Sequence, residues 1–319
     1  LVKLIDRTFN ADSKRAAEII KYIIENSVNT SVHFEISPQI LTDELINLLN
    51  SAPKGMFQLE MGIQTLNKDS LKAINRYADW SVISENIGKL QKSRNMHIHL
   101  DLIAGLPYED YESFGKSFNE VNSLKPDMLQ LGFLKVLHGT LMENQEGIIH
   151  ADFPPYEVIS TKWVSAQEMC RLKDIEDTVE TFYNSGAFKR TIEHITKGDA
   201  FAEFENLADK FKKASENGNI KRVDLYQFLY EIYGDSIKEP LIYDFLESNK
   251  NHSLPPFAQR DDIKGFKEKC HILLRNDEFL RKYRIEPNLK SLRFEPVLGK
   301  VVMVDYQKSS IHDITTYFI

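Results

Sequence analysis

One segment of the chain alternates apolar and polar side chains, as does a strand that has one face in the core and a polar face that can bind a ligand. In residues 57–64, Glu60, Gly62 and Gln64 alternate with Leu, Met and Ile, so the polar residues share one face and the apolar residues the other. Gly62 leaves room on that face for a bulky group to approach. Because a carboxylate or amide is costly in a dry core without a partner, this face is expected to bind a polar ligand.

Two further segments, residues 32–36 and 97–104, repeat the pattern and would extend the polar face. Their polar members are His33, Glu35, His97, His99 and Asp101. Structural or surface roles are expected for His33 and His97, whereas the role of His99 stays open. The spacing of the three histidines carries no specificity for a metal ion.

Helical patterns separate these segments and predict a parallel sheet. Strands are expected at 2–5, 32–36, 57–63, 97–104 and 128–136, and helices at 13–26, 42–49, 68–75, 81–92 and 111–124. Strand–helix–strand repeats of this kind are typical of right-handed βαβ units. Parallel barrels place their sites at the ends of such strands, so the polar groups are expected to gather there.

Five strands are too few for a closed eight-stranded barrel, and the chain opens inside the first predicted strand. We therefore expect an α/β fold in which residues 1–145 form a partial (β/α)6 TIM-like barrel that lacks its first strand. On this interpretation the chain is truncated at its N-terminus, and the chemistry carried by the missing strand is absent.

The pattern changes after residue 145. Residues 146–319 predict a mainly helical domain, with one long helix over 163–188 and a terminal β element whose strands are expected at 292–297, 301–307 and 313–319. Pro296 predicts that the first of these is an edge strand. Cys170 and Cys270 are both expected on helices, as buried free thiols.

Composition argues against two classes of function. A net charge of −7 does not provide the basic face that nucleic-acid binding requires. No apolar run approaches the roughly 20 residues that span a bilayer. The prediction is therefore a cytoplasmic protein that acts on a small-molecule substrate, without nucleic-acid or membrane partners.

Three strings, VHFEI, FQLEMGIQTLNKDSLKAINR and HLDLIAGLPYEDYESF, resemble the radical S-adenosylmethionine (SAM) superfamily. The most similar branch contains oxygen-independent coproporphyrinogen III dehydrogenase and the radical SAM proteins with a cobalamin-binding domain. The resemblance covers residues 1–140. Its most specific element is the set Gln64, Arg76 and Asp101, spaced as in the porphyrinogen enzymes.

The resemblance implies a [4Fe–4S] cluster on three cysteines of a C-x3-C-x2-C loop, SAM bound at that cluster, and a reductant such as flavodoxin or ferredoxin. Reduction of the cluster cleaves SAM, and the resulting radical abstracts hydrogen from the substrate. Glu35 matches an acid that contacts SAM in relatives, and Gln64, Arg76 and Asp101 match positions that line the SAM region. Arg76 would clamp a carboxylate of methionine or of the substrate; a surface position on a helix is the alternative for this residue. Glu60 matches less well and is a pocket candidate only. Cobalamin and a second SAM stay open as further cofactors.

The chain departs from the family because it lacks the three-cysteine loop. It is therefore expected to be inactive as it stands, with no catalytic residue and no metal ligand assigned, whereas its parent protein is expected to be a radical SAM oxidoreductase or transferase. Two alternatives stay open. One is a cluster-free, metal-dependent barrel enzyme that uses Glu35, His99 and Asp101, and the other is a non-catalytic barrel scaffold that binds a partner.

Overall fold

The computed structural model describes residues 1–216, 218, 220–285 and 291–319, which fold into two compact units. Unit 1 consists of Leu1–Gly186 and Gly198–Lys213, and unit 2 of Ala187–Lys197 and Ala214–Ile319. The domain boundary expected between residues 145 and 146 falls within unit 1 and stays a prediction.

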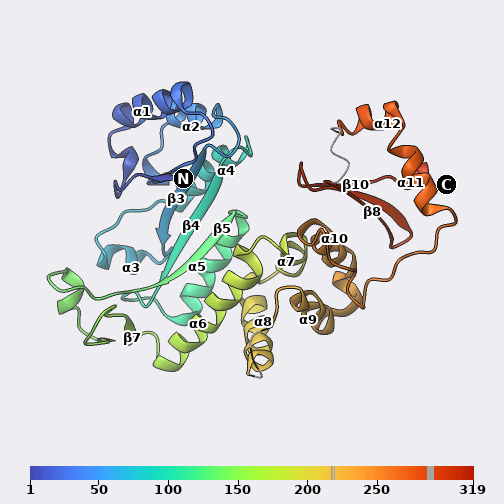
Figure 1. Ribbon diagram of the computed structural model, residues 1–319. Helices are drawn as coiled ribbons and strands as arrows, with labels where there is room; N and C mark the ends of the chain where they lie inside the picture. Colours follow the sequence, from blue (N-terminus) through green and yellow to red (C-terminus); the bar gives the residue numbers. More distant parts are fainter. Residues whose placement is uncertain (217, 219, 286–290) are drawn as a thin grey trace. The chain divides into compact units, whose positions relative to one another are not determined.

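A five-stranded parallel sheet forms the centre of unit 1 (Figure 1). Its strands lie in chain order: β1 (Val2–Lys3), β2 (Val32–Glu35), β3 (Phe57–Gln64), β4 (His97–Ala104) and β5 (Met128–Phe133). The connections carry α1 (Ser13–Asn26), α2 (Asp43–Asn50), α3 (Lys68–Ala73), α4 (Trp80–Gln91) and α5 (Tyr111–Ser123). These elements lie within a few residues of the expected ranges, which confirms the α/β fold with a parallel sheet. The partial (β/α)6 barrel that lacks one strand stays a prediction.

Short polar side chains begin the helices of unit 1. The Asp12 carboxylate accepts a hydrogen bond from Arg15 N (3.0 Å) at the start of α1. The Asn67 side chain accepts hydrogen bonds from Asp69 N (3.0 Å) and Ser70 N (3.1 Å) at the start of α3. These bonds satisfy backbone N–H groups that have no partner within the helix, so the caps define where the helices begin.

The apolar face of the sheet forms the core of unit 1. Phe34, Leu59, Met61 and Leu100 are each 0% exposed. Phe34 stacks on Phe9 with the ring centroids 4.4 Å apart. Because the side chains of a strand alternate, burial of these residues places their polar neighbours together on the opposite face.

After β5 the chain adds a small antiparallel sheet and further helices to unit 1. These elements are β6 (Ile148–His150), β7 (Val158–Thr161), α6 (Ala166–Thr178), the π-helical segment η4 (Val179–Asn184) and α8 (Ala200–Ser215). The long helix expected over residues 163–188 is thus α6 followed by η4. Ser165 and Glu168 form a capping box that begins α6.

Unit 2 is mainly helical and ends in a three-stranded antiparallel sheet, which confirms the expected character of the C-terminal region. Its elements include α7 (Lys189–Ile195), α9 (Asp224–Tyr233), α10 (Lys238–Ser248), α11 (Phe266–Leu273), α12 (Asp277–Lys282), β8 (Leu292–Val297), β9 (Lys300–Asp305) and β10 (Ser310–Asp313). Strand β8, which contains Pro296, lies at an edge of the sheet, as predicted.

Two expectations about the C-terminal half are wrong. The third strand was expected at 313–319, but the chain turns after β10 because Ile314 and Phe318 pack into the core of unit 2 with Met303. Cys170 lies on α6 as expected, yet it is exposed, because α6 buries a stripe that does not include it. Cys270 lies on α11 and is half-buried. Among the described helices, none has the length and apolar character needed to cross a membrane.

Candidate functional site

Neighbouring strands of the sheet are paired so that their polar side chains lie side by side. Glu35 of β2 is opposite Glu60 of β3, and Glu60 is opposite His99 of β4. Two residues further along, Gly62 is opposite Asp101. The pairing therefore assembles the predicted polar residues of three strands on one face.

Gly62 provides the space in which three of the predicted site residues meet. A Cβ atom at this position would lie 2.0 Å from Gln64 Nε2 and 3.7 Å from Arg76 Nη1. Arg76 Nη1 donates a hydrogen bond to the backbone oxygen of Gly62 (3.1 Å). Arg76 as a whole residue is exposed, but partial burial of its guanidinium lowers its pKa, and the negative charge of Asp101 opposes this effect. The structure thus brings Gln64, Arg76 and Asp101 together around a glycine.

The end of β3 departs from regular strand geometry at Gln64. The register shifts between Gly62 and Gln64, so that Gln64 pairs with Leu102, and the φ angle of Gln64 is +71°. A left-handed backbone is uncommon for a residue other than glycine and is typical of turns and functional constraints. With this backbone, the Gln64 amide lies over Gly62.

Several buried polar atoms on this face have unmet hydrogen bonds. Gln64 Oε1, His99 Nε2 and Asp101 Oδ1 have no hydrogen-bond partner in the described part of the chain. His99 Nε2 and Asp101 Oδ1 lie 2.8 Å apart, at ion-pair distance but outside hydrogen-bond geometry. Burial lowers the pKa of His99, but Asp101 and Glu60 outweigh it and leave this pKa above its ordinary value. Because an unpartnered buried polar atom is costly, Gln64 Oε1 fits a ligand that supplies a hydrogen-bond donor, whereas His99 and Asp101 are charge partners of one another.

Glu35 and Glu60 belong to a second polar network on the same face. Lys3 Nζ lies 3.5 Å from Glu35 Oε1 and 3.3 Å from Glu60 Oε2. His33 Nε2 lies 2.8 Å from Glu60 Oε2, in line with the structural role expected of His33. Burial raises the pKa of Glu60, but His33 and Lys3 outweigh it and hold this pKa below its ordinary value. Glu60 thus contacts two side chains of the protein, His33 and Lys3, and Glu35 contacts Lys3.

A metal site on this face finds no support in the geometry. The described residues contain no group of three or more His, Cys, Asp and Glu side chains that could hold a metal ion. The set Glu35, His99 and Asp101, on which the metal-dependent alternative depends, is therefore not gathered around one point.

A buried carboxyl group that no pattern in the sequence indicated, Glu109, lies near the ends of β3 and β4. Glu109 is 1% exposed, and its Oε1 atom accepts hydrogen bonds from Thr65 Oγ1 (2.5 Å) and Ser117 Oγ (3.4 Å). Burial raises the pKa of Glu109 to about 7. An acidic residue beside a helix cap, here Asp110, is ordinary in a sequence, so the pattern carries no signal that Glu109 is buried.

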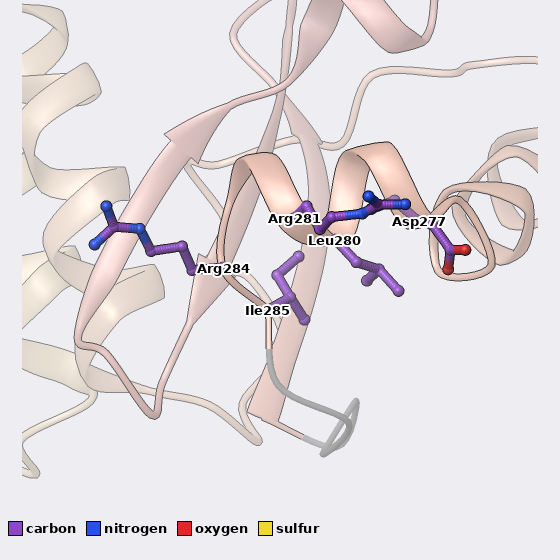
Figure 2. A pocket seen from close by; sticks show the side chains of 5 residues that line it. All are labelled: Asp277, Leu280, Arg281, Arg284 and Ile285. Carbon is purple, nitrogen blue, oxygen red and sulfur yellow. The ribbon is translucent and has the colours of Figure 1, made fainter.

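Unit 2 contains a separate pocket of about 480 Å³ at α12, shown in Figure 2. It is lined by Asp277, Leu280, Arg281, Arg284 and Ile285. Arg281 Nε donates a hydrogen bond to the backbone oxygen of Asp277 (3.3 Å). The guanidinium groups of Arg281 and Arg284 point in opposite directions in Figure 2, so they do not form a common anion site.

Two family models match the chain. Residues 144–314 match the family described as "protein of unknown function (DUF4080)", and residues 4–121 match the radical SAM superfamily. Among curated proteins, the oxygen-independent coproporphyrinogen III oxidase of Salmonella typhimurium is 22% identical over 289 residues, which cover 89% of this chain and 58% of the relative. The chain thus spans less than two thirds of that relative.

Two solved structures are also similar to the chain. Coproporphyrinogen III oxidase from Escherichia coli is 20% identical with a TM-score of 0.40, and the match covers 55% of this chain and 38% of that one. The radical SAM methyltransferase TsrM from Kitasatospora setae, solved with cobalamin and a [4Fe–4S] cluster bound, is 14% identical with a TM-score of 0.41; this match covers 48% of this chain and 31% of that one.

Proposed function

The chain belongs to the DUF4080 family of proteins of unknown function and carries a radical SAM superfamily domain over residues 4–121, and from this premise we propose that the polar face of its sheet binds SAM. The finer proposal is that the parent protein is a radical SAM enzyme, in which a reduced [4Fe–4S] cluster cleaves SAM and hydrogen is abstracted from a substrate. A small-molecule substrate, a reductant such as flavodoxin or ferredoxin and a cytoplasmic location belong to the same proposal.

The convergence of Gln64, Arg76 and Asp101 on Gly62 is the observation that supports SAM binding most directly. Gln64 Oε1 is a buried acceptor without a hydrogen-bond partner among the described residues, Asp101 adds a negative charge, and the hydroxyl and ammonium groups of SAM are donors. The Arg76 guanidinium can donate two parallel hydrogen bonds to the carboxylate of SAM. The three side chains therefore complement the polar groups of SAM in both charge and hydrogen-bond character.

Glu35 would add a further acceptor on β2. Its contact with Lys3 spans 3.5 Å, and the Lys3 side chain is 50% exposed. An ion pair as exposed as this one stabilises a protein by roughly 1 kcal/mol or less. A ligand donor can therefore replace Lys3 at Glu35 at little cost.

The residues of this chain do not fit a cluster held by three cysteines. The chain has two cysteines, Cys170 and Cys270, which lie in different units. We therefore propose that the cluster ligands of the parent protein lie outside these 319 residues. On this proposal the chain by itself binds SAM without cleaving it.

Equilibrium binding of SAM to the 319-residue chain tests the site directly. Arg76→Gln and Asp101→Asn should each weaken SAM binding by roughly 10- to 100-fold, since each removes a charged hydrogen-bond partner. Lys72→Gln is the matched control, because Lys72 is an exposed residue of α3 on the same segment as Arg76, and it should bind SAM like the wild type. Wild-type affinity in both site variants would refute the assignment.

The activity is tested with the native full-length protein, reconstituted anaerobically with iron and sulfide and reduced in the presence of SAM. Formation of 5′-deoxyadenosine would support a radical SAM enzyme. Failure of the protein to assemble any cluster would favour the alternative, a non-catalytic barrel scaffold.

A further inference from the structure

Glu109 lies apart from the proposed SAM contacts, yet it joins the two segments that carry them. It stands in the loop that follows β4, the strand of Asp101. Its carboxyl group contacts Thr65, the residue next to Gln64 at the end of β3. Movement of Glu109 would therefore displace residues at the ends of both β3 and β4.

The Glu109 carboxyl orients the hydroxyl groups that hold the turn after β3. Thr65 Oγ1 donates to Glu109 Oε1 (2.5 Å) and accepts from Asn67 N (2.9 Å). Ser117 Oγ of α5 donates to the same oxygen (3.4 Å) and accepts from Leu66 N (3.1 Å). One carboxyl oxygen thus sets the direction of two hydroxyl groups, and each of these hydroxyls holds one backbone N–H of the turn.

Two further hydrogen bonds link the same turn to the loop after β4. Asn67 Nδ2 donates to the backbone oxygen of Tyr108 (3.0 Å), and Ser70 Oγ donates to that of Pro107 (2.6 Å). The segments that follow β3 and β4 are therefore cross-linked beside Glu109 as well.

Burial without a counter-charge favours the neutral carboxyl of Glu109, and this effect outweighs the hydroxyls of Thr65 and Ser117, whose donated hydrogen bonds favour the anion. Its Oε2 atom is buried and has no hydrogen-bond partner, and no Lys, Arg or His within the described residues pairs with it. The groups that face it are the hydroxyls of Thr65 and Ser117 and the like-charged carboxylate of Asp110. A buried carboxylate without a counter-charge is strongly disfavoured, so ionisation would drive Glu109 toward water.

We propose that Glu109 is a positioning residue that, while it carries its proton, latches the ends of β3 and β4 together and thereby holds Gln64 and Asp101 in place for SAM. The consequence for SAM rests on the function proposed above. Burial raises the pKa of Glu109 from 4.5 to about 7, so the latch weakens progressively as the pH rises from about 4.5 and is at its weakest above about 7. SAM affinity falls over the same range.

Hydrogen exchange of the Leu66 and Asn67 amides tests the latch without any ligand. Exchange is compared between the wild type and Glu109→Gln at the same pH, so that the intrinsic pH dependence of exchange cancels. Glutamine keeps the acceptor oxygen but has no proton to lose in this range. The wild-type rate should exceed that of the variant at both pH values, and the ratio of the two rates should rise roughly tenfold between pH 6 and 8, as the buried carboxyl ionises.

SAM affinity, measured over the same pH range, tests the consequence of the latch. The ratio of the dissociation constants of the wild type and Glu109→Gln should rise roughly tenfold between pH 6 and 8. Glu112→Gln, an exposed glutamate of the first turn of α5, is the matched control and should follow the wild type. An exchange ratio that stays flat with pH would overturn the proposal. A pH-dependent exchange ratio without SAM binding at any pH would support the latch and refute the SAM site.

Discussion

Replacing Gly62 with alanine should weaken SAM binding at the proposed site and leave the fold intact. The added Cβ atom would lie 2.0 Å from Gln64 Nε2, a separation that real atoms do not tolerate, so the Gln64 amide must move. The clashing atom, Gln64 Nε2, lies at the end of a flexible side chain and not in the backbone. Arg76 Nη1, at 3.7 Å from the same position, would keep ordinary van der Waals contact but would lose its neighbour Gln64.

The Gly62→Ala substitution should have opposite effects on the stability of the fold and on the affinity for SAM. Gly62 does not have a left-handed backbone, so alanine fits its φ and ψ angles, and alanine in a strand is about 0.5–1 kcal/mol more favourable than glycine. The free energy of unfolding should therefore stay the same or rise slightly. The proposed hydrogen bond between Gln64 and SAM would be lost, and Arg76 would be held less firmly. Together these changes should weaken SAM binding by roughly 2 kcal/mol, or about 30-fold in affinity.

The assay combines calorimetric titration of SAM with urea unfolding of the same preparations. Gly88→Ala on α4 is the matched control, because no atom lies within 4 Å of its added Cβ, and it should leave SAM affinity unchanged. Gly62→Ala with wild-type affinity would show that Gln64 takes no part in binding. A loss of stability above about 1 kcal/mol would show that the Gln64 side chain cannot move aside, which would also refute the reasoning.

Two further predictions concern the other parts of the molecule. Asp244→Ala should lower the free energy of unfolding of unit 2 by about 2–4 kcal/mol, because the buried carboxylate accepts hydrogen bonds from Thr191 N and Thr191 Oγ1, both at 2.8 Å. Hydrogen exchange in α7 and α10 under increasing urea measures this change, and an effect below about 1 kcal/mol would contradict it. Iodoacetamide at pH 8 should modify Cys170 first, because Cys170 is exposed, whereas burial raises the pKa of Cys270 to about 11 and so lowers its thiolate population about 100-fold relative to its ordinary value. Mass spectrometry of the labelled peptides follows both thiols, and equal labelling rates would be inconsistent with this burial.

The strands and helices of the parallel sheet could be predicted because their signals are local. The alternation in residues 57–64 and 97–104 is visible in the sequence, and the structure forms β3 and β4 over these residues. Asn67 directly precedes the helix expected at 68–75, and its side chain caps α3. In each case the evidence lies within one turn of helix or a few residues of strand.

The predictions that failed depend on packing between distant residues. Cys170 lies in an apolar neighbourhood of the sequence, but only the position of the buried stripe of α6 decides that it is exposed. The segment at residues 313–319, expected to form a strand, contains apolar residues. In the structure two of them, Ile314 and Phe318, pack into the core of unit 2. A short apolar segment can form a strand or place single side chains in a core, and the residues that surround it in space determine which of the two occurs.

By itself, the sequence determined which polar residues share a face, because side chains alternate strictly along a strand and burial of one set exposes the other. It also determined, through its motifs, the superfamily of residues 4–121. Only the tertiary structure decided that Arg76 reaches the backbone oxygen of Gly62 and that Glu109 is buried between the ends of β3 and β4. The reason is physical: these contacts join side chains from separate loops, and their energies depend on desolvation and distance, which no local pattern encodes.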